Sequence, residues 1–225
     1  MTQPLVVAVD GPAGAGKSTA SRALARRLGF SHVDTGAMYR VVGVLARERA
    51  IALDDDEALG LLVGGLSFAI GEGERLLADG RDLTDAIRRA DAGELASRVA
   101  ARPVVRTRLV PLQRALAAPA GVVMEGRDIG TVVFPDAPVK LYLTAAPGER
   151  ARRRAVELRA RGETIDEAAL ARDIAARDRR DSERAHSPLR PAADAVVLDT
   201  TTLTLETVVD EMERIARARL GASRP

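Results

Sequence analysis

The stretch that decides the fold reads LVVAVDGPAGAGKS and runs from Leu5 to Ser18. Its apolar start shows no alternation and is rich in valine, which is typical of a parallel strand buried on both faces. The part that begins at Gly11 satisfies the pattern G-x-x-x-x-G-K-[ST]. Apolar residues then recur at helical spacing up to Leu28, and Gly29 stands where a glycine would end a helix. The order strand, loop, helix is the context that this pattern requires.

This loop predicts a binding site for nucleotide phosphates. Glycines let several backbone N–H groups point at one anion. The N-terminus of the next helix carries the positive end of the helix dipole, which also stabilises an anion. We expect Lys17 to bridge the β- and γ-phosphates and the Ser18 hydroxyl to bind Mg²⁺. Lysine occurs elsewhere only at Lys140, and arginine supplies the other basic positions. The use of lysine at residue 17 therefore indicates that this position needs a compact charge, which a fork-shaped guanidinium cannot replace. The nucleotide-binding residues that the motif predicts are Gly11, Pro12, Ala13, Gly14, Ala15, Gly16, Lys17, Ser18 and Thr19.

Strands and helices alternate along the rest of the chain. Short apolar runs recur at residues 122–124, 139–143 and 195–198, and residues 168–176 and 205–220 show helical periodicity. This alternation predicts an α/β fold with a parallel sheet and helices on both of its faces.

One segment departs from that rhythm. Residues 66–70 alternate between apolar and polar, residues 71–73 predict a tight turn, and residues 75–78 run back. We expect a hairpin here, within a small insert of antiparallel strands and helix between about Gly64 and Pro103.

Composition narrows the range of partners and locations. The 34 basic and 32 acidic side chains nearly cancel to a net charge of +2, so no strong field favours nucleic acid or anionic lipid. The chain has no cysteine and no apolar stretch near its start that is long enough to span a membrane. We therefore expect a cytoplasmic protein that binds small molecules, with no nucleic acid and no membrane as partner. We further expect a monomer, which does not follow from the composition.

The phosphate loop alone leaves a kinase, a motor and a switch GTPase open. Guanine-specific GTPases usually read the base with an N-K-x-D motif, and this chain contains no asparagine. ATP is therefore the favoured nucleotide, and the chain is short for a motor.

A second strand-to-helix junction reads VDTGAMYR over residues 33–40, where Asp34 or Thr35 taken alone would be a helix N-cap. The other distinctive segments are DGPAGAGKS at residues 10–18, GRDIGTVVFP at residues 126–135 and the arginines between residues 177 and 184. In combination, from about Leu5 to Leu220, the chain resembles the bacterial cytidylate kinases.

That resemblance implies the P-loop nucleoside monophosphate kinase fold, with a five-stranded parallel sheet flanked by helices, a small acceptor-binding insert containing antiparallel strands, and a short lid. Residues 1–63 and 104–225 would form the kinase core, with the lid at about 147–165, and residues 64–103 would form the insert. The implied activity is ATP-dependent phosphorylation of CMP and dCMP, with ATP as phosphoryl donor and Mg²⁺ as cofactor.

The resemblance also implies roles for single residues. Thr35, Arg40 and Arg127 would hold the acceptor phosphate; Ser97, Arg106, Asp128 and Arg184 would surround the cytosine; Arg177 and Asp181 would reach the ribose; and Tyr39 would join the acceptor site. The catalytic group would comprise Lys17, Arg40, Arg127, Asp128 and Arg153. Arginine forks offset the repulsion between two phosphate groups, and Asp128 can accept from the cytosine amino group while Arg106 or Arg184 donates to the ring carbonyl. Uracil would be disfavoured at such a site because it reverses the first of these patterns.

The resemblance likewise identifies the arginine-rich run at 150–154, which opens a helix after Pro147, as the lid that excludes water. Metal candidates are Ser18, Asp10 and Glu125. Glu125 stands where relatives commonly carry aspartate, and Asp10 could alternatively fix the loop. His32 and His186 lack metal-ligand spacing and are interpreted as structural or surface residues.

Two other readings remain open at this point. The same fold could serve a kinase for UMP, AMP or a non-nucleotide acceptor, since the phosphate loop says nothing of the acceptor. The chain could instead be a nucleotide-dependent switch or an RNA-binding factor that uses its arginines, although its few, scattered aromatic residues argue against a base-stacking surface.

Overall fold

The structure is a computed structural model that describes residues 5–71, 75–89, 91–117 and 120–222. It has the predicted α/β architecture and divides into two compact units. The first comprises Met1–His32 and Ala117–Pro225, and the second comprises Val33–Leu116.

The first unit is built on a five-stranded sheet in the order β2-β6-β1-β7-β8. Its strands are β1 (Val6–Asp10), β2 (Ser31–Asp34), β6 (Val122–Glu125), β7 (Val139–Thr144) and β8 (Val196–Asp199). The pairs β1–β6, β1–β7 and β7–β8 are parallel, so their carboxyl ends meet at one edge. The predicted parallel sheet flanked by helices is therefore confirmed. The unit boundary falls within the edge strand β2.

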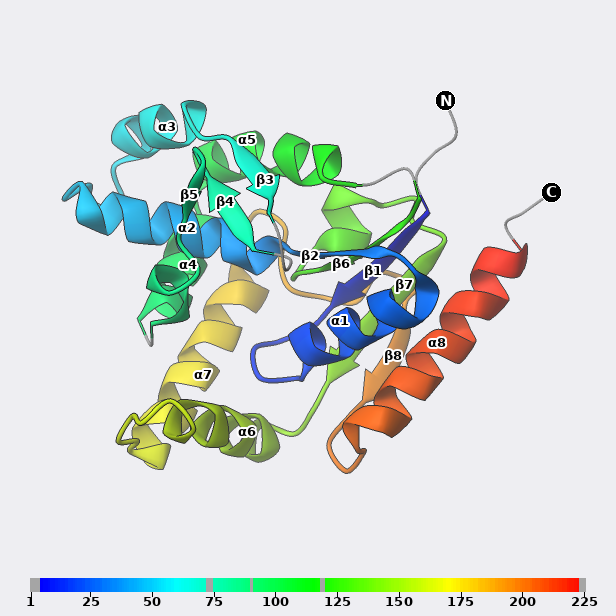
Figure 1. The fold of residues 1–225 in the computed structure, drawn as a ribbon. Coiled ribbons are helices and arrows are strands. Elements are labelled where there is room, and N and C mark those ends of the chain that lie inside the picture. Colours follow the sequence, from blue (N-terminus) through cyan, green and yellow to red (C-terminus); the bar gives the residue numbers. More distant parts are fainter. Residues whose placement is uncertain (1–4, 72–74, 90, 118–119, 223–225) are drawn as a thin grey trace. The chain divides into compact units, whose positions relative to one another are not determined.

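The helices of this unit are α1 (Lys17–Leu28), the π-helical turn η3 (Ile129–Val133), α6 (Pro147–Arg159), α7 (Glu167–Glu183) and α8 (Leu205–Ala222). Helices α1 and α8 lie side by side against the sheet (Figure 1) and share with it a core around Leu24, Leu141 and Met212. As predicted, α1 ends at Gly29, which adopts a left-handed φ of 69°. Helices α6 and α7 pack against each other.

The second unit contains α2 (Thr35–Glu48), α3 (Asp56–Gly64), η2 (Ala86–Arg88), α4 (Ala92–Ala100), α5 (Pro103–Ala115) and a three-stranded antiparallel sheet. The strands of that sheet are β3 (Phe68–Ile70), β4 (Leu76–Ala78) and β5 (Arg81–Asp82). The predicted hairpin is confirmed by the pairing of Phe68 with Ala78, whereas β5 was not predicted. Of the predicted turn, Glu72 and Gly73 lie outside the described residues.

The predicted insert of residues 64–103 lies inside this second unit. The compact unit extends further in both directions because α2, α3 and α5 share one hydrophobic core with the hairpin, built around Met38, Leu59 and Leu109. That the insert binds the acceptor stays a prediction.

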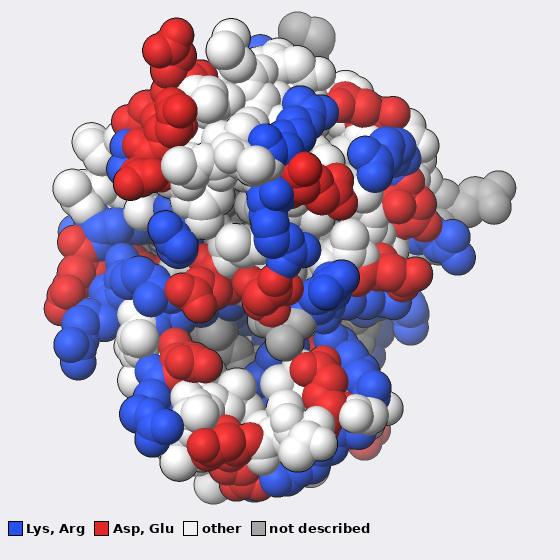
Figure 2. All heavy atoms as spheres, turned by 90° about the vertical axis from the view of Figure 1, so that its left-hand side faces the viewer, with Lys and Arg blue, Asp and Glu red and all other residues white. Residues whose placement is uncertain are grey.

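Charges on the surface are mixed in sign. On the face drawn in Figure 2, basic and acidic side chains are interspersed. None of the helices in the described part of the chain is both long and apolar enough to cross a membrane.

Candidate active site

The phosphate loop lies between β1 and α1 (Figure 1), at the carboxyl edge of the sheet, as predicted. Gly11, Gly14 and Gly16 all have positive φ, of 145°, 77° and 83°. At Gly11 a Cβ atom would lie 1.9 Å from the Leu143 carbonyl oxygen, so no side chain fits there. The loop backbone therefore packs directly against β7 at Gly11 and leads into the N-terminus of α1. This arrangement is suited to binding an anion.

Lys17 is the first residue of α1 and is buried, with Nζ donating to the Pro12 carbonyl at 2.6 Å. Burial holds the pKa of Lys17 well below its usual value, and the positive charges of Arg127 and Arg177 lower it further. Glu125 acts in the opposite direction. A bound phosphate would stabilise the charged form of Lys17, because its negative charge offsets both the burial and the positive charges nearby. The site therefore favours binding of a polyanion.

Ser18, Glu125 and His32 form a hydrogen-bonded group. The Ser18 hydroxyl donates to Glu125 Oε2 at 2.8 Å, and His32 Nε2 lies 3.0 Å from Glu125 Oε1. His32 and Glu125 are 5% and 2% exposed. The interpretation of His32 as a structural or surface residue therefore overlooked its contact with a predicted metal residue.

The oxygen atoms of Ser18 and Glu125 are suitable ligands for a hard cation. The hydroxyl of Ser18 and the carboxylate of Glu125 are oxygen ligands of the kind that Mg²⁺ prefers. Within the described ranges, no three His, Cys, Asp or Glu side chains form a group that could hold a metal by themselves. Mg²⁺ does not need such a group, because it is usually bound through one or two protein oxygens together with phosphates.

Asp10 fixes the segment that follows β6. Its two carboxylate oxygens accept hydrogen bonds from the backbone N–H groups of Ile129 and Gly130, both at 2.8 Å. Burial raises the pKa of Asp10 to about 6, although these two hydrogen bonds act against the rise. Asp10 therefore anchors η3. Its alternative role in fixing the phosphate loop and its role in ordering metal-bound water both stay predictions.

An arginine–aspartate cluster joins the segment after β6 to α7. Asp181 Oδ2 lies 3.3 Å from Arg127 Nε and 3.8 Å from Arg177 Nε, and Arg184 Nη2 lies 3.8 Å from Asp128 Oδ1. Asp128 and Asp181 are 4% and 3% exposed. The structure thus brings together five residues that the family resemblance placed around the acceptor.

The remaining predicted acceptor residues belong to the second unit. Asp34 caps α2, as expected, by accepting from the Ala37 N–H at 3.1 Å, and its other oxygen accepts from Arg40 Nη2 at 2.5 Å. Thr35 is buried at the start of the same helix. The ion pair holds Arg40 beside the first turn of α2.

Arg106 and Tyr39 also contact each other in this unit. The guanidinium carbon of Arg106 lies 5.7 Å from the centre of the Tyr39 ring, within the range of a cation–π interaction. Arg106 on α5 and Ser97 on α4 are 5% and 4% exposed. Burial of an arginine and a serine in one unit is uncommon, and the family resemblance places both positions at the acceptor site.

Helix α6 begins at Pro147, as predicted, and its first arginine contacts the phosphate loop. Arg150 is buried and forms an ion pair with Asp178 of α7. It donates from Nη1 to the Ala13 carbonyl at 3.1 Å and from Nε to the Ala145 carbonyl at 2.9 Å. The sequence did not single out Arg150 or Asp178. The sequence feature that could have identified Arg150 is its spacing of three residues from Arg153, which places both side chains on one side of a helix.

Arg153, the predicted catalytic arginine of the lid, lies next to the same loop. It donates to the hydroxyl and carbonyl oxygens of Thr200 at 3.0 and 2.6 Å, and a Cβ atom at Gly16 would lie 3.7 Å from its Nη1. Arg153 also pairs with Glu149 of its own helix, at 2.8 Å. Arg152 and Arg154 pair with glutamates of that helix as well. The catalytic role of Arg153 stays a prediction.

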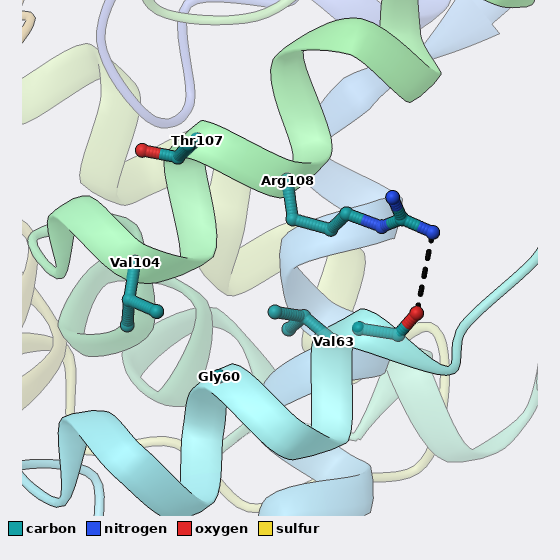
Figure 3. A pocket seen from close by; sticks show the side chains of 6 residues that line it. Gly60, Val63, Val104, Thr107 and Arg108 are labelled. Atoms are coloured by element: carbon teal, nitrogen blue, oxygen red, sulfur yellow. Dashed lines mark hydrogen bonds between the residues drawn. The ribbon is translucent and has the colours of Figure 1, made fainter.

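A separate pocket of about 450 Å³ lies between α3 and α5 (Figure 3). It is lined by Gly60, Val63, Gly64, Val104, Thr107 and Arg108. Arg108 is its one charged lining residue and donates to the Gly64 carbonyl at 3.2 Å. None of the predicted site residues lines this pocket, so we do not assign the chemistry to it.

The glycine-rich loop at the carboxyl edge of a parallel sheet, with its buried lysine and adjacent arginines, defines the class of P-loop kinases. A family model described as cytidylate kinase matches residues 7–218. The chain therefore belongs to the cytidylate kinase family.

Individual relatives agree with that assignment. The chain is 50% identical over 224 residues to a cytidylate kinase from Geobacter sulfurreducens, covering 97% of this chain and 95% of the relative. It is 48% identical over 220 residues to a cytidylate kinase from Citrifermentans bemidjiense, covering 96% and 94%. Among solved structures, a gluconokinase from Sinorhizobium meliloti 1021 covers 99% of this chain and 97% of its own length at 16% identity, with a TM-score of 0.49, too low to support a conclusion.

Proposed function

We propose that this protein transfers the γ-phosphoryl group of ATP to CMP or dCMP, giving ADP and CDP or dCDP. The observation that carries the proposal is the family match over residues 7–218, a range that contains both the phosphate loop and the arginine–aspartate cluster. Phosphoryl transfer depends mainly on positioning and charge stabilisation, and these two features supply groups for both.

The phosphate loop would hold the donor. Its backbone N–H groups and the N-terminus of α1 would bind the phosphates of ATP, with Lys17 stabilising the charge that develops during transfer. The buried position of Lys17 strengthens its interaction with an anion because less water screens it.

Ser18 and Glu125 would hold Mg²⁺, with Asp10 as a further candidate. When bound, the ion would offset negative charge on the phosphates of ATP. The hydroxyl of Ser18 donates its hydrogen to Glu125, which leaves its oxygen lone pairs available to a cation.

The predicted acceptor residues would bind the phosphate group of the acceptor. Thr35, Arg40 and Arg127 would each donate hydrogen bonds to it. The acceptor is already an anion, so the reaction needs no dedicated general base. The arginine charges would reduce the repulsion between the two phosphate groups as they meet.

Recognition of the nucleoside would depend on the buried polar residues. Asp128 and Arg184, which approach each other to 3.8 Å, would face the cytosine together with Ser97 and Arg106. Arg177 and Asp181 would bind the ribose hydroxyls, and Tyr39 would support the site through its contact with Arg106.

The remaining proposals concern the lid, the insert and the state of the protein. Residues 147–165 would form a lid in which Arg153 contacts the reacting phosphates, and residues 64–103 would form the acceptor-binding insert. The protein would act as a monomer in the cytoplasm. We propose small molecules as its only substrates, and the mixed charges in Figure 2 argue against a nucleic-acid surface on that face.

The test is a panel of acceptors. The purified protein is incubated with ATP and Mg²⁺, and ADP is measured in parallel with CMP, dCMP, UMP, AMP, GMP and no acceptor. Fast turnover with CMP or dCMP and little without acceptor is expected. Faster turnover with UMP or AMP would overturn the base assignment, and equal ADP in every reaction would indicate an acceptor-independent ATPase or a switch protein.

A further inference from the structure

We propose that His32 is a positioning residue for the metal–nucleotide site, holding one oxygen of Glu125 so that the other oxygen faces Ser18. The inference rests on the proposed function, because it gives Glu125 and Ser18 their role at the phosphates of ATP.

Three separate elements supply the three residues. His32 lies on the edge strand β2, Glu125 ends the neighbouring strand β6, and Ser18 lies in the first turn of α1. His32 Nε2 is 3.0 Å from Oε1 of Glu125, while the Ser18 hydroxyl donates to Oε2 at 2.8 Å. Each carboxylate oxygen thus has a different partner, and the two partners fix the plane of the carboxylate.

A glutamate needs this support more than an aspartate would. Its side chain has one more rotatable bond, so an unsupported carboxylate at this position could adopt several orientations. The side chains of His32 and Glu125 are each 3% exposed. Water therefore cannot readily replace the contact, and loss of the imidazole would leave a buried oxygen without that partner.

The consequence for the metal is indirect. Groups that hydrogen-bond a metal ligand orient it, and removing them typically costs about 10-fold to 100-fold in metal affinity or activity. We therefore expect His32 to affect the contribution of Mg²⁺ to nucleotide binding, and to have little effect on nucleotide binding without the metal.

Three variants separate a positioning role from a packing role. His32→Gln keeps a donor nitrogen as many bonds from Cβ as Nε2 of histidine, whereas His32→Asn places its nitrogen one bond closer. His32→Leu keeps apolar volume but has no donor. Glutamine and asparagine share the same amide chemistry, so they form a matched pair that differs in reach.

The measurement uses ADP as probe and needs no turnover. Calorimetric titration gives the Kd of ADP in EDTA and in saturating Mg²⁺, and their ratio is the Mg²⁺-dependent gain. His32→Gln should retain that gain to within about threefold, while His32→Asn and His32→Leu should lose about tenfold, with the Kd in EDTA changed by less than about twofold in all three. Circular dichroism and thermal denaturation would confirm that each variant folds.

Several results would overturn the inference. An unchanged gain in all three variants, or equal losses in His32→Gln and His32→Asn, would show that the Nε2 contact does not position Glu125. Failure of both His32→Asn and His32→Leu to fold would show that His32 serves the fold itself. The wild-type protein separates this inference from the proposed function, because absence of any Mg²⁺-dependent gain or of CMP-dependent turnover there would contradict the function before any variant is considered.

Discussion

Replacing Asp10 with asparagine should change how the stability of the protein depends on pH. In the folded protein burial raises the pKa of Asp10 to about 6, from an ordinary value of 3.8. Between these two values the unfolded chain has lost the proton while the folded chain keeps it. Stability from this group therefore falls as pH rises through the window, and is constant above about pH 6.

The magnitude follows from the difference between the pKa of Asp10 in the folded protein and in the unfolded chain. A tenfold difference in proton affinity corresponds to about 1.4 kcal/mol. Because the unfolded carboxylate is already more than half ionised at pH 4, the wild-type protein should lose roughly 2 kcal/mol between pH 4 and pH 7 from ionisation of Asp10 alone. Asp10→Asn cannot ionise and lacks this loss. It instead presents an NH₂ group toward one of the N–H groups of Ile129 and Gly130, which removes one charge-assisted hydrogen bond at neutral pH, a cost of about 1.5 to 3 kcal/mol.

Urea denaturation followed by circular dichroism, at intervals from pH 4 to pH 7.5 without nucleotide, measures both proteins. The free energy of unfolding of the wild type minus that of Asp10→Asn should fall by roughly 2 kcal/mol as pH rises across this range. A difference that stays constant to within about 0.5 kcal/mol, or that increases with pH, would refute the assignment of a raised pKa to a carboxylate buried against η3.

Three further variants test other parts of the structure. Asp181→Asn should raise the KM for CMP about tenfold and change the KM for ATP by less than about twofold, and an equal effect on both would remove Asp181 from the acceptor site. Gly11→Ala should prevent stable folding or nucleotide binding, because its Cβ would lie 1.9 Å from the Leu143 carbonyl oxygen; wild-type ADP affinity in a calorimetric titration would contradict this. Asp178→Asn should lower the free energy of unfolding by about 2 kcal/mol, since Arg150 is left buried without its ion-pair partner, and an unchanged urea midpoint would count against that contact.

The fold was predictable where the local sequence pattern meets a specific requirement of the backbone, such as a buried strand or a positive φ angle. The valine-rich strand, the loop glycines and Gly29 specified the β1–loop–α1 unit, because these residues meet requirements that few alternatives satisfy. The two-residue strand β5 was not predictable, since so short a segment carries no periodicity.

The candidate site was predictable only in part, for a similar reason. Arg127 and Asp181 followed from a family resemblance, and the structure places them 3.3 Å apart. The contact of His32 with Glu125 depends on β2 lying beside β6, an order that hydrophobic periodicity does not specify. The contact of Arg150 with the phosphate loop was not predictable either, because the other arginines of α6 have the same side-chain chemistry.

The most direct measurement follows the phosphate itself. ATP labelled with ³²P at the γ-position is incubated with CMP, Mg²⁺ and either wild-type protein or Lys17→Ala, and the nucleotides are separated by thin-layer chromatography. We expect label to appear in CDP with wild-type protein, and the rate to fall about 100-fold to 1,000-fold in a folded Lys17→Ala protein, which lacks the buried charge at the reacting phosphate. Label released only as inorganic phosphate, or equal rates of labelled CDP formation by the two proteins, would contradict the proposed transfer.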